Sequence, residues 1–312
     1  MTQNRGRNSP VEHGFPHLAT VRAALTALHR RLSRDGIQAY ATGFAPADAA
    51  FTDSDDLYLG AQRVAAAVVR HLQLPDARMV IAYRSMAEAA TVELTAGPEY
   101  FIEVNDRFRT HRRDLAAALA HEVTHVLLHR LGLHFPGTGT GTGADADADG
   151  TPADEILTDT AAAYLGAGWL LLDAYREDAL GHQKLGYLTP EEFGYVLAKR
   201  AAFFGPAADP SVLFTSPQAY EAYVRGAALA RRDRQRPPLA AAGPVARRRY
   251  ARARRAGAAA APDGAPYRFE GAGAELRVSF PCPVCEQRVR VPVRGRLRAR
   301  CALCGTVLDC DT

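Results

Sequence analysis

The residues best suited to chemistry in this sequence are two histidines and a glutamate near its middle. His121, Glu122 and His125 form the pattern H-E-x-x-H. On a helix, residues four apart project from nearly the same face, so both imidazoles can reach one metal ion. Zinc accepts neutral imidazole nitrogens, and a neighbouring carboxylate can take a proton from water at the metal. The pattern therefore predicts a catalytic zinc site with Glu122 as general base.

A catalytic zinc site needs a third protein ligand and a position left open for water or substrate. One known arrangement has a third histidine six residues after the second, but that position holds Leu131. The other common arrangement takes a glutamate from a following helix. Glu155 and Asp159 fit it, because residues four apart on a helix share a face. We expect Glu155 to complete the ligand set and Asp159 to orient a ligating histidine through its free ring nitrogen.

Hydrolysis at such a zinc site would also need a group that stabilises the negative charge developing on the substrate oxygen. The sequence offers a histidine and several tyrosines within or after the second helix of the site and does not decide among them. The candidates are His182, Tyr164, Tyr187 and Tyr195, with His182 and Tyr164 placed first. We expect His129, one turn beyond His125, to be an ordinary histidine and not a ligand.

Four cysteines near the C-terminus predict a second metal site. Cys282, Cys285, Cys301 and Cys304 form two C-x2-C pairs with fifteen residues between them. Four thiolates at this spacing can close a tetrahedral structural zinc site. Strand-like segments at 275–280 and 289–293 frame the first pair, which is typical of a small β zinc ribbon that needs its metal to fold. Cys310 is left over, and we expect it to be a free thiol.

The pair of motifs in the first two thirds of the chain resembles a known class of enzymes. H-E-x-x-H followed by Glu155-x-x-x-Asp159 is similar to the gluzincin type of zinc metallopeptidases. The short spacing is similar to small cytosolic ImmA/IrrE-type peptidases, and residues 155–204 resemble a group of uncharacterised bacterial H-E-x-x-H proteins. The resemblance covers about residues 57–205. It implies a zincin-like α+β core and zinc-dependent hydrolysis of a peptide or protein.

In that class the strand before the active-site helix pairs with an extended peptide. A strand at a sheet edge offers free main-chain hydrogen-bond partners for such pairing. The corresponding segment here consists of Tyr100, Phe101, Ile102, Glu103 and Val104.

Apolar periodicity predicts an α+β fold around these motifs. Helices are expected at 17–33, 57–72, 112–131, 153–175, 189–204 and 217–230. Strands are expected at 79–83, 91–94 and 100–104, with Gly97-Pro98 in a turn. Composition suggests four parts: a disordered leader at 1–16, the zincin-like domain at 17–230, a basic flexible linker at 231–266 and the zinc ribbon at 267–312. Within the linker, residues 244–256 could form a transient helix.

Composition and charge indicate the cellular location of the protein and the kinds of partner that it binds. The 312 residues include no apolar run near the roughly 20 needed to cross a bilayer, so no membrane partner is expected. The polar N-terminus lacks an apolar signal core, and the Ala- and Arg-rich composition suggests a bacterial source, so we expect a cytoplasmic protein. Alternating arginines along 288–300 and the basic linker suit nucleic acid or an acidic protein.

Two functions follow for the whole chain. The first is a cytosolic zinc metallopeptidase with two Zn²⁺ ions, one catalytic and one structural, whose ribbon recruits a substrate. The alternative is a catalytically inactive regulatory protein that keeps the fold and binds nucleic acid or a protein through its linker and ribbon.

Overall fold

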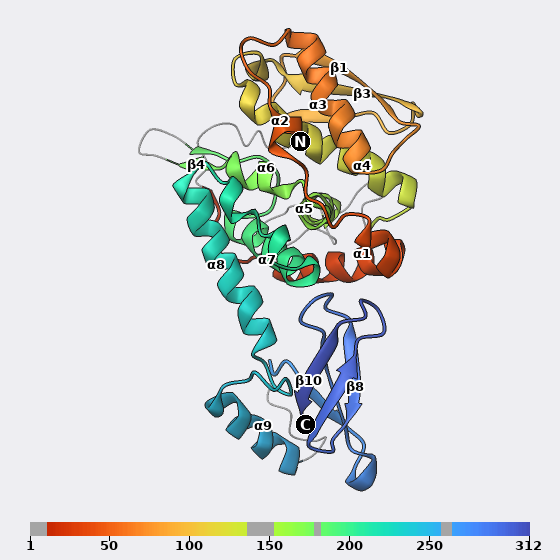
Figure 1. The fold of residues 1–312 in the computed structure, drawn as a ribbon, viewed down its shortest axis with the longest axis vertical. Coiled ribbons are helices and arrows are strands. Elements are labelled where there is room, and N and C mark those ends of the chain that lie inside the picture. Colours follow the sequence, from red (N-terminus) through yellow and green to blue (C-terminus); the bar gives the residue numbers. More distant parts are fainter. Residues whose placement is uncertain (1–10, 136–152, 178–181, 257–263) are drawn as a thin grey trace.

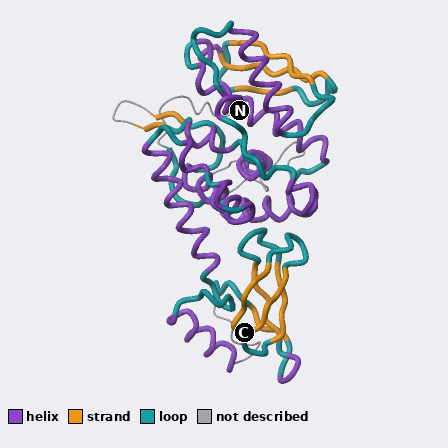
Figure 2. Tube along the Cα trace, viewed as in Figure 1, coloured by secondary structure: helices purple, strands orange, loops and turns teal. Residues whose placement is uncertain are grey.

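The computed structural model describes residues 11–135, 153–177, 182–256 and 264–312. These residues form a helical body with a small sheet at one end and a compact group of strands beyond the other (Figures 1 and 2). The fold is of the α+β class, with a small β region at the C-terminus that carries the four paired cysteines. Within the described residues, no helix combines the length and the apolar character needed to span a bilayer.

The helices and strands lie close to the segments predicted from apolar periodicity. The α-helices are α1 (Leu18–Gln38), α2 (Pro46–Ala49), α3 (Leu57–His71), α4 (Leu115–Leu131), α5 (Ala153–Leu165), α6 (Gly168–Asp173), α7 (Pro190–Phe204), α8 (Pro217–Arg234) and α9 (Pro244–Ala256). The strands are β1 (Arg78–Arg84), β2 (Ala90–Val92), β3 (Glu99–Asn105), β4 (Arg176–Glu177), β5 (His182–Gln183), β6 (Arg268–Glu270), β7 (Arg277–Pro281), β8 (Arg288–Pro292), β9 (Arg296–Arg300) and β10 (Val307–Asp311).

The small sheet of the body has helices on one face. Its strand order is β1-β3-β2, with β1 parallel to β3 and β2 antiparallel to it. Burial alternates along β1 and β3, as expected when one face is packed and the other meets water. The packed face, which includes Ile81 and Ile102, lies toward α3 and α4. The sheet therefore supports the helix that carries the H-E-x-x-H motif.

Helices α4 and α5 pack against each other in the middle of the body. Both consist almost wholly of buried residues, including Leu119 and Val123 of α4. Gly132 ends α4 in the left-handed conformation that glycine adopts without steric cost. The backbone N–H of Phe135 donates to the Asp154 carboxylate at 2.8 Å. This bond ties the segment after α4 to the first turn of α5.

The predicted disordered leader is wrong for residues 11–16. Val11 is buried, and the backbone N–H of Gly14 donates to the Glu191 carboxylate at 3.2 Å. The next residues continue the contact, since the N–H of His17 donates to Glu192 at 2.6 Å. Two glutamates at the start of α7 therefore anchor this segment, a tertiary contact that composition does not reveal. Residues 1–10 of the predicted leader lie outside the described residues.

The predicted flexible linker is also wrong over most of its length. Helix α8 continues to Arg234, and α9 occupies Pro244–Ala256. Tyr250 and Ala253 anchor α9 in the core of the ribbon, where the Tyr250 ring lies 4.9 Å from that of Tyr267. These two apolar residues pack into the ribbon core although the composition around them is basic. Residues 257–263 of the predicted linker are not among those described.

The ribbon holds two antiparallel sheets, β6-β7-β8 and β9-β10. The cysteine pairs lie in the turns that connect β7 to β8 and β9 to β10. In Figure 1 the upper loops of the ribbon face α1, and α8 runs down from the body toward the ribbon. A hydrogen bond from the Thr26 hydroxyl to the Cys285 carbonyl at 2.8 Å joins α1 directly to the first cysteine turn.

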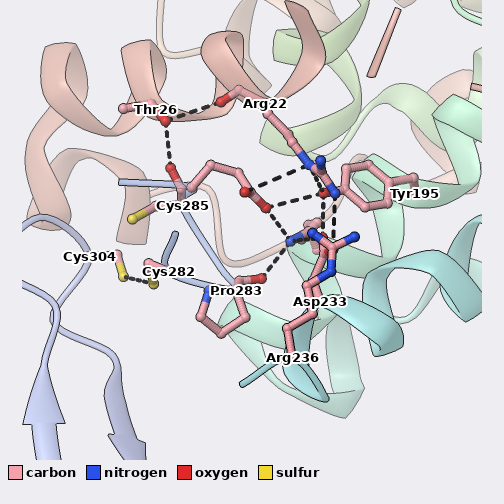
Figure 3. A network of polar contacts seen from close by, with 11 residues as sticks. Arg22, Thr26, Tyr195, Asp233, Arg236, Cys282, Pro283, Cys285 and Cys304 are labelled. Atoms are coloured by element: carbon pink, nitrogen blue, oxygen red, sulfur yellow. Dashed lines mark hydrogen bonds and ion pairs between the residues drawn. The ribbon is translucent and has the colours of Figure 1, made fainter. Parts of the chain in front are cut away.

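A buried network of charges fixes the ribbon to the body (Figure 3). The Lys199 ammonium is 1% exposed and lies 2.6 Å from a Glu286 oxygen, 2.7 Å from an Asp233 oxygen and 2.7 Å from the Pro283 carbonyl. Arg22 adds an ion pair to Asp233 at 3.0 Å. Since α1 and α7 each supply a partner for the first cysteine turn, and Asp233 of α8 pairs with Lys199, the ribbon is docked and not tethered.

Candidate metal centres

Two groups of side chains within the described chain have the donor atoms and spacing to hold a metal ion. One contains His121, His125 and Glu155, and the other contains the four paired cysteines. Helix α4 supplies both histidines from one face, and α5 supplies the glutamate across the helix contact. The structure thus brings together the three residues that the sequence predicted as ligands. His129 is exposed and belongs to neither group.

The spacing of the first group matches a tetrahedral ion. His121 Nε2 lies 3.1 Å from His125 Nε2 and 3.2 Å from Glu155 Oε2, and His125 Nε2 lies 3.3 Å from the same oxygen. Ligands placed at the 2.0–2.1 Å typical of zinc form a tetrahedron with edges of about 3.3 Å. The three atoms therefore occupy three corners, and the arrangement leaves a fourth corner for another ligand.

Hydrogen bonds at the far sides of the rings fix both tautomers. His121 Nδ1–H donates to Asp159 Oδ1 at 2.8 Å, as the sequence predicted for Asp159. The Thr158 hydroxyl donates to the Asp154 carbonyl at 2.9 Å, so its oxygen accepts from His125 Nδ1–H at 3.2 Å. Each neutral ring then presents a lone pair at Nε2. Two lone pairs and a carboxylate oxygen converge on one point, which is the donor set of a cation site.

Electrostatics agree with this assignment. Burial lowers the pKa of His121, but the Asp159 and Glu155 carboxylates outweigh burial and raise it well above its ordinary value. Burial raises the pKa of Glu155, whereas hydrogen bonds with His121 and His125 lower it more strongly. The cluster thus attracts positive charge. A bound metal would supply that charge in place of a proton on the ring.

Glu122 lies beside the ligands on the same turn of α4. It is buried, and burial raises the pKa of its carboxyl group. No side-chain hydrogen bond joins it to another part of the described chain. A buried carboxylate without a protein partner is costly unless it binds water or substrate. This position suits a group that exchanges protons with a molecule held at the metal.

The loop that leads into α7 holds Asp159 from the other side. The backbone N–H groups of Tyr187 and Leu188 donate to Asp159 Oδ2. Gly186 has φ +80°, and a Cβ there would lie 2.6 Å from that oxygen. The close approach of backbone to carboxylate therefore requires glycine. Asp159 in turn donates no proton but accepts from His121 Nδ1–H, so the loop helps to orient His121 through Asp159.

The predicted oxyanion stabilisers lie in different parts of the structure. Tyr187 is near the cluster, with its ring 5.9 Å from that of His121 and its side chain 41% exposed. Burial and the Glu155 and Asp159 carboxylates raise its pKa, which keeps the hydroxyl protonated as a donor. Tyr195 lies in the docking network, where its hydroxyl donates to Asp233 at 2.7 Å. His182 begins β5, and its side chain is outside the described part of the chain.

The prediction that Tyr164 stabilises the oxyanion is wrong. Its side chain is fully buried, and its hydroxyl lies 2.9 Å from His29 Nε2 on α1. Burial lowers the pKa of His29 to about 4, so a neutral ring meets this hydroxyl. Tyr164 follows Asp159 by five residues, which turns it about 140° around α5 and away from the metal ligands.

The prediction that residues 100–104 form a sheet edge is also wrong. β3, which contains Tyr100, Phe101, Ile102, Glu103 and Val104, is the central strand, and both its edges are paired. The edge strand nearest α4 is β2. The backbone N–H of Glu93 donates to the Phe101 carbonyl, and the N–H of Asn105 donates to the Ala89 carbonyl. Along the β2–β3 pair, residues whose backbone groups bond to β3 therefore alternate with residues whose backbone groups do not. By that alternation Ala90 and Val92 direct their N–H and C=O groups away from β3.

The four paired cysteines form the second group. Cys282 Sγ lies 3.7 Å from Cys304 Sγ, and Cys285 Sγ lies 3.6 Å from Cys301 Sγ. A tetrahedron of thiolates at 2.3 Å has edges of about 3.8 Å, whereas a disulfide would bring two sulfurs to about 2.0 Å. All four are buried free thiols that can surround one ion. Cys310 is a free thiol outside this group, as predicted.

Sequence reasoning missed Thr158 as a partner of His125. The available signal was its position three residues after Glu155 and next to Asp159, which places it near the same face of α5.

Comparison with known proteins adds no assignment to this geometry. No protein-family model, curated protein or solved structure matches the chain.

Proposed function

We propose that this protein is a zinc-dependent peptidase of the gluzincin type, with Glu122 as general base. The proposal rests on one observation, the convergence of lone pairs from His121, His125 and Glu155 at tetrahedral spacing beside the buried Glu122 carboxylate, which has no side-chain hydrogen bond within the described chain. Catalytic zinc sites use three protein ligands and keep one position open, whereas structural sites use four. The four-cysteine group fits the structural kind.

Each residue of the first site has a separate role in the proposed hydrolysis. Zinc, when bound, would polarise the scissile carbonyl and acidify a water molecule. Glu122 takes a proton from the attacking water at a carboxylate oxygen and passes it to the leaving amine. To Tyr187, whose ring lies 5.9 Å from that of His121, we assign the hydrogen bond to the developing oxyanion.

The free edge of β2 is the place where this proposal puts an extended substrate. Ala90 and Val92 direct main-chain donors and acceptors outward, and β2 packs against α4. A peptide that added a strand there would run past the helix that carries Glu122. This assignment replaces the predicted role of β3.

Replacing Glu122 by glutamine tests the proposal. We expect Glu122→Gln to keep two zinc ions per chain by elemental analysis and to hydrolyse a mixture of fluorogenic peptides at least about 100-fold more slowly. Glu221→Gln, an exposed change on α8, is the matched control and should keep full activity. A Glu122→Gln variant as active as the parent contradicts the assigned base. A parent that binds zinc but cleaves nothing favours the inactive regulatory protein.

A further inference from the structure

Positive charge is strongly segregated along the chain. Residues 231–312 contain 18 arginines, no lysine and 7 acidic residues, whereas residues 1–230 contain 20 basic and 27 acidic residues. The modest net charge of +4 thus hides an acidic body and a basic tail. A tail of this charge attracts polyanions at long range.

Five of the six arginines of helix α9 fall into two groups. Its buried side, with Tyr250 and Ala253, packs on the ribbon. Arg247 and Arg254 hold it there through Asp311 at 3.6 Å and the Thr312 carbonyl at 2.9 Å.

The second group, Arg248, Arg252 and Arg255, is exposed and forms no ion pair with a described carboxylate. These three positions follow i, i+4, i+7 spacing and make one stripe about 10 Å long at 1.5 Å per residue. The helix itself contains no acidic residue. The stripe is therefore a row of guanidinium groups on a fixed helix, and no described carboxylate forms an ion pair with them.

We propose that α9 binds double-stranded nucleic acid by its phosphates through Arg248, Arg252 and Arg255. A duplex carries one negative charge per about 1.7 Å of its axis, so a stripe of this length meets several phosphates. Guanidinium groups bind phosphate oxygens in a bidentate manner. Anchoring of α9 to the ribbon presents the three side chains from a fixed backbone, which lowers the entropy lost on binding.

The scarcity of exposed apolar and aromatic side chains among the described residues after 230 favours a duplex over an acidic protein or a single strand. A protein interface needs an apolar centre. Among the described residues after 230, the large hydrophobic side chains that are exposed are Val245 and Val307. Single strands stack on exposed aromatic rings. The aromatic residues of this region are all buried, namely Tyr250, Tyr267, Phe269 and Phe280. A duplex requires neither feature, because interfaces with DNA are polar and strongly positive.

The test measures binding of the full-length protein to labelled duplexes of about 20 base pairs between about 50 and 200 mM salt. Arms with DNA and with RNA identify which duplex the protein prefers. We expect Arg248→Gln/Arg252→Gln/Arg255→Gln to reduce the slope of log affinity against log salt by about 2.7, or 0.9 per lost contact. The matching triple change to lysine should restore most of the slope. Zinc content and circular dichroism show that the variants fold.

A control removes the same charge elsewhere. Arg31, Arg70 and Arg78 are exposed on the body, and their triple change to glutamine should leave the slope unchanged. An equal loss in this control overturns the proposal, since net charge alone would then explain binding. Tighter binding of an oligothymidine strand, or of polyglutamate, also overturns it in favour of a single strand or an acidic protein. Glu122→Gln should bind duplex normally, so this result is independent of the peptidase assignment.

Discussion

At the scale of single residues, Thr158 determines which nitrogen of His125 is available for a metal. Its hydroxyl is committed as a donor to the Asp154 carbonyl and accepts from His125 Nδ1–H. Thr158→Val keeps the shape of the side chain and removes that acceptor. We expect the affinity of the histidine site for zinc to fall about 10–100-fold, the usual effect of losing an outer partner of a ligating histidine. Chelator competition measures the loss.

The same helix provides a matched control for Thr158→Val. Thr160 is buried, and its hydroxyl has no hydrogen-bond partner in the described chain. Thr160→Val removes the same atom type from α5 and should leave zinc affinity unchanged, with stability equal or slightly higher. If both variants lose zinc equally, perturbation of α5 and not the hydrogen bond to His125 is responsible.

The residues that the sequence predicted and the one that it missed differ in a physical way. His121, His125, Glu155 and Asp159 follow from helix periodicity, because spacing of four residues already fixes a common face. Thr158 back-bonds to a carbonyl four residues earlier, which is ordinary behaviour for a threonine inside a helix. Its second role depends on how α4 crosses α5, and no local pattern encodes that crossing.

At the scale of elements, the loop before α7 controls the metal site through Asp159. Gly186→Ala would place a Cβ 2.6 Å from the Asp159 carboxylate in a backbone with φ +80°. We expect a stability loss of at least about 1–2 kcal/mol from left-handed strain. We also expect weaker zinc binding at the histidine site, because Asp159 must move away from His121. Thermal unfolding and chelator competition report the two effects separately.

Gly205→Ala separates strain from the contact with Asp159. Gly205 has φ +98°, and a Cβ there would have no atom within 4 Å. This variant should lose stability through strain alone and bind zinc normally. Weaker zinc binding in Gly205→Ala as well would mean that general destabilisation, not displacement of Asp159, empties the site.

The elements themselves were largely predictable, but the pairing of strands was not. Alternation and the Gly97-Pro98 turn indicate β3 and its antiparallel neighbour β2. The parallel pairing of β1 with β3 joins segments separated by an intervening strand, and neither segment carries a mark of it. The sheet edge was therefore assigned to the wrong strand.

Helix α9 is anchored by Tyr250 and Ala253 although the composition around them is basic. An average over the composition of the segment conceals these two residues.

At the scale of the whole molecule, the ribbon turn that meets the body carries a strained residue. The residue after each second cysteine is left-handed, with φ +61° at Glu286 and φ +73° at Gly305. Each also donates its N–H to the carbonyl of the first cysteine of its pair. Glycine adopts this conformation freely, whereas another residue pays about 1–2 kcal/mol. The ion pair between Glu286 and Lys199 offsets that strain, so the two halves of the molecule stabilise each other.

Replacing Glu286 by glutamine tests this coupling. Glu286→Gln keeps the left-handed residue but leaves buried Lys199 with one carboxylate, Asp233, and breaking a buried pair costs about 3–5 kcal/mol. Trp169, the sole tryptophan, lies in α6, so its fluorescence reports urea unfolding of the body. We expect Glu286→Gln to lower the free energy of unfolding of the body by about 3–5 kcal/mol. Glu270→Gln, which removes an exposed pair with Arg290, should cost less than about 1 kcal/mol. An unchanged Trp169 transition in Glu286→Gln would mean that the ribbon and the body unfold independently.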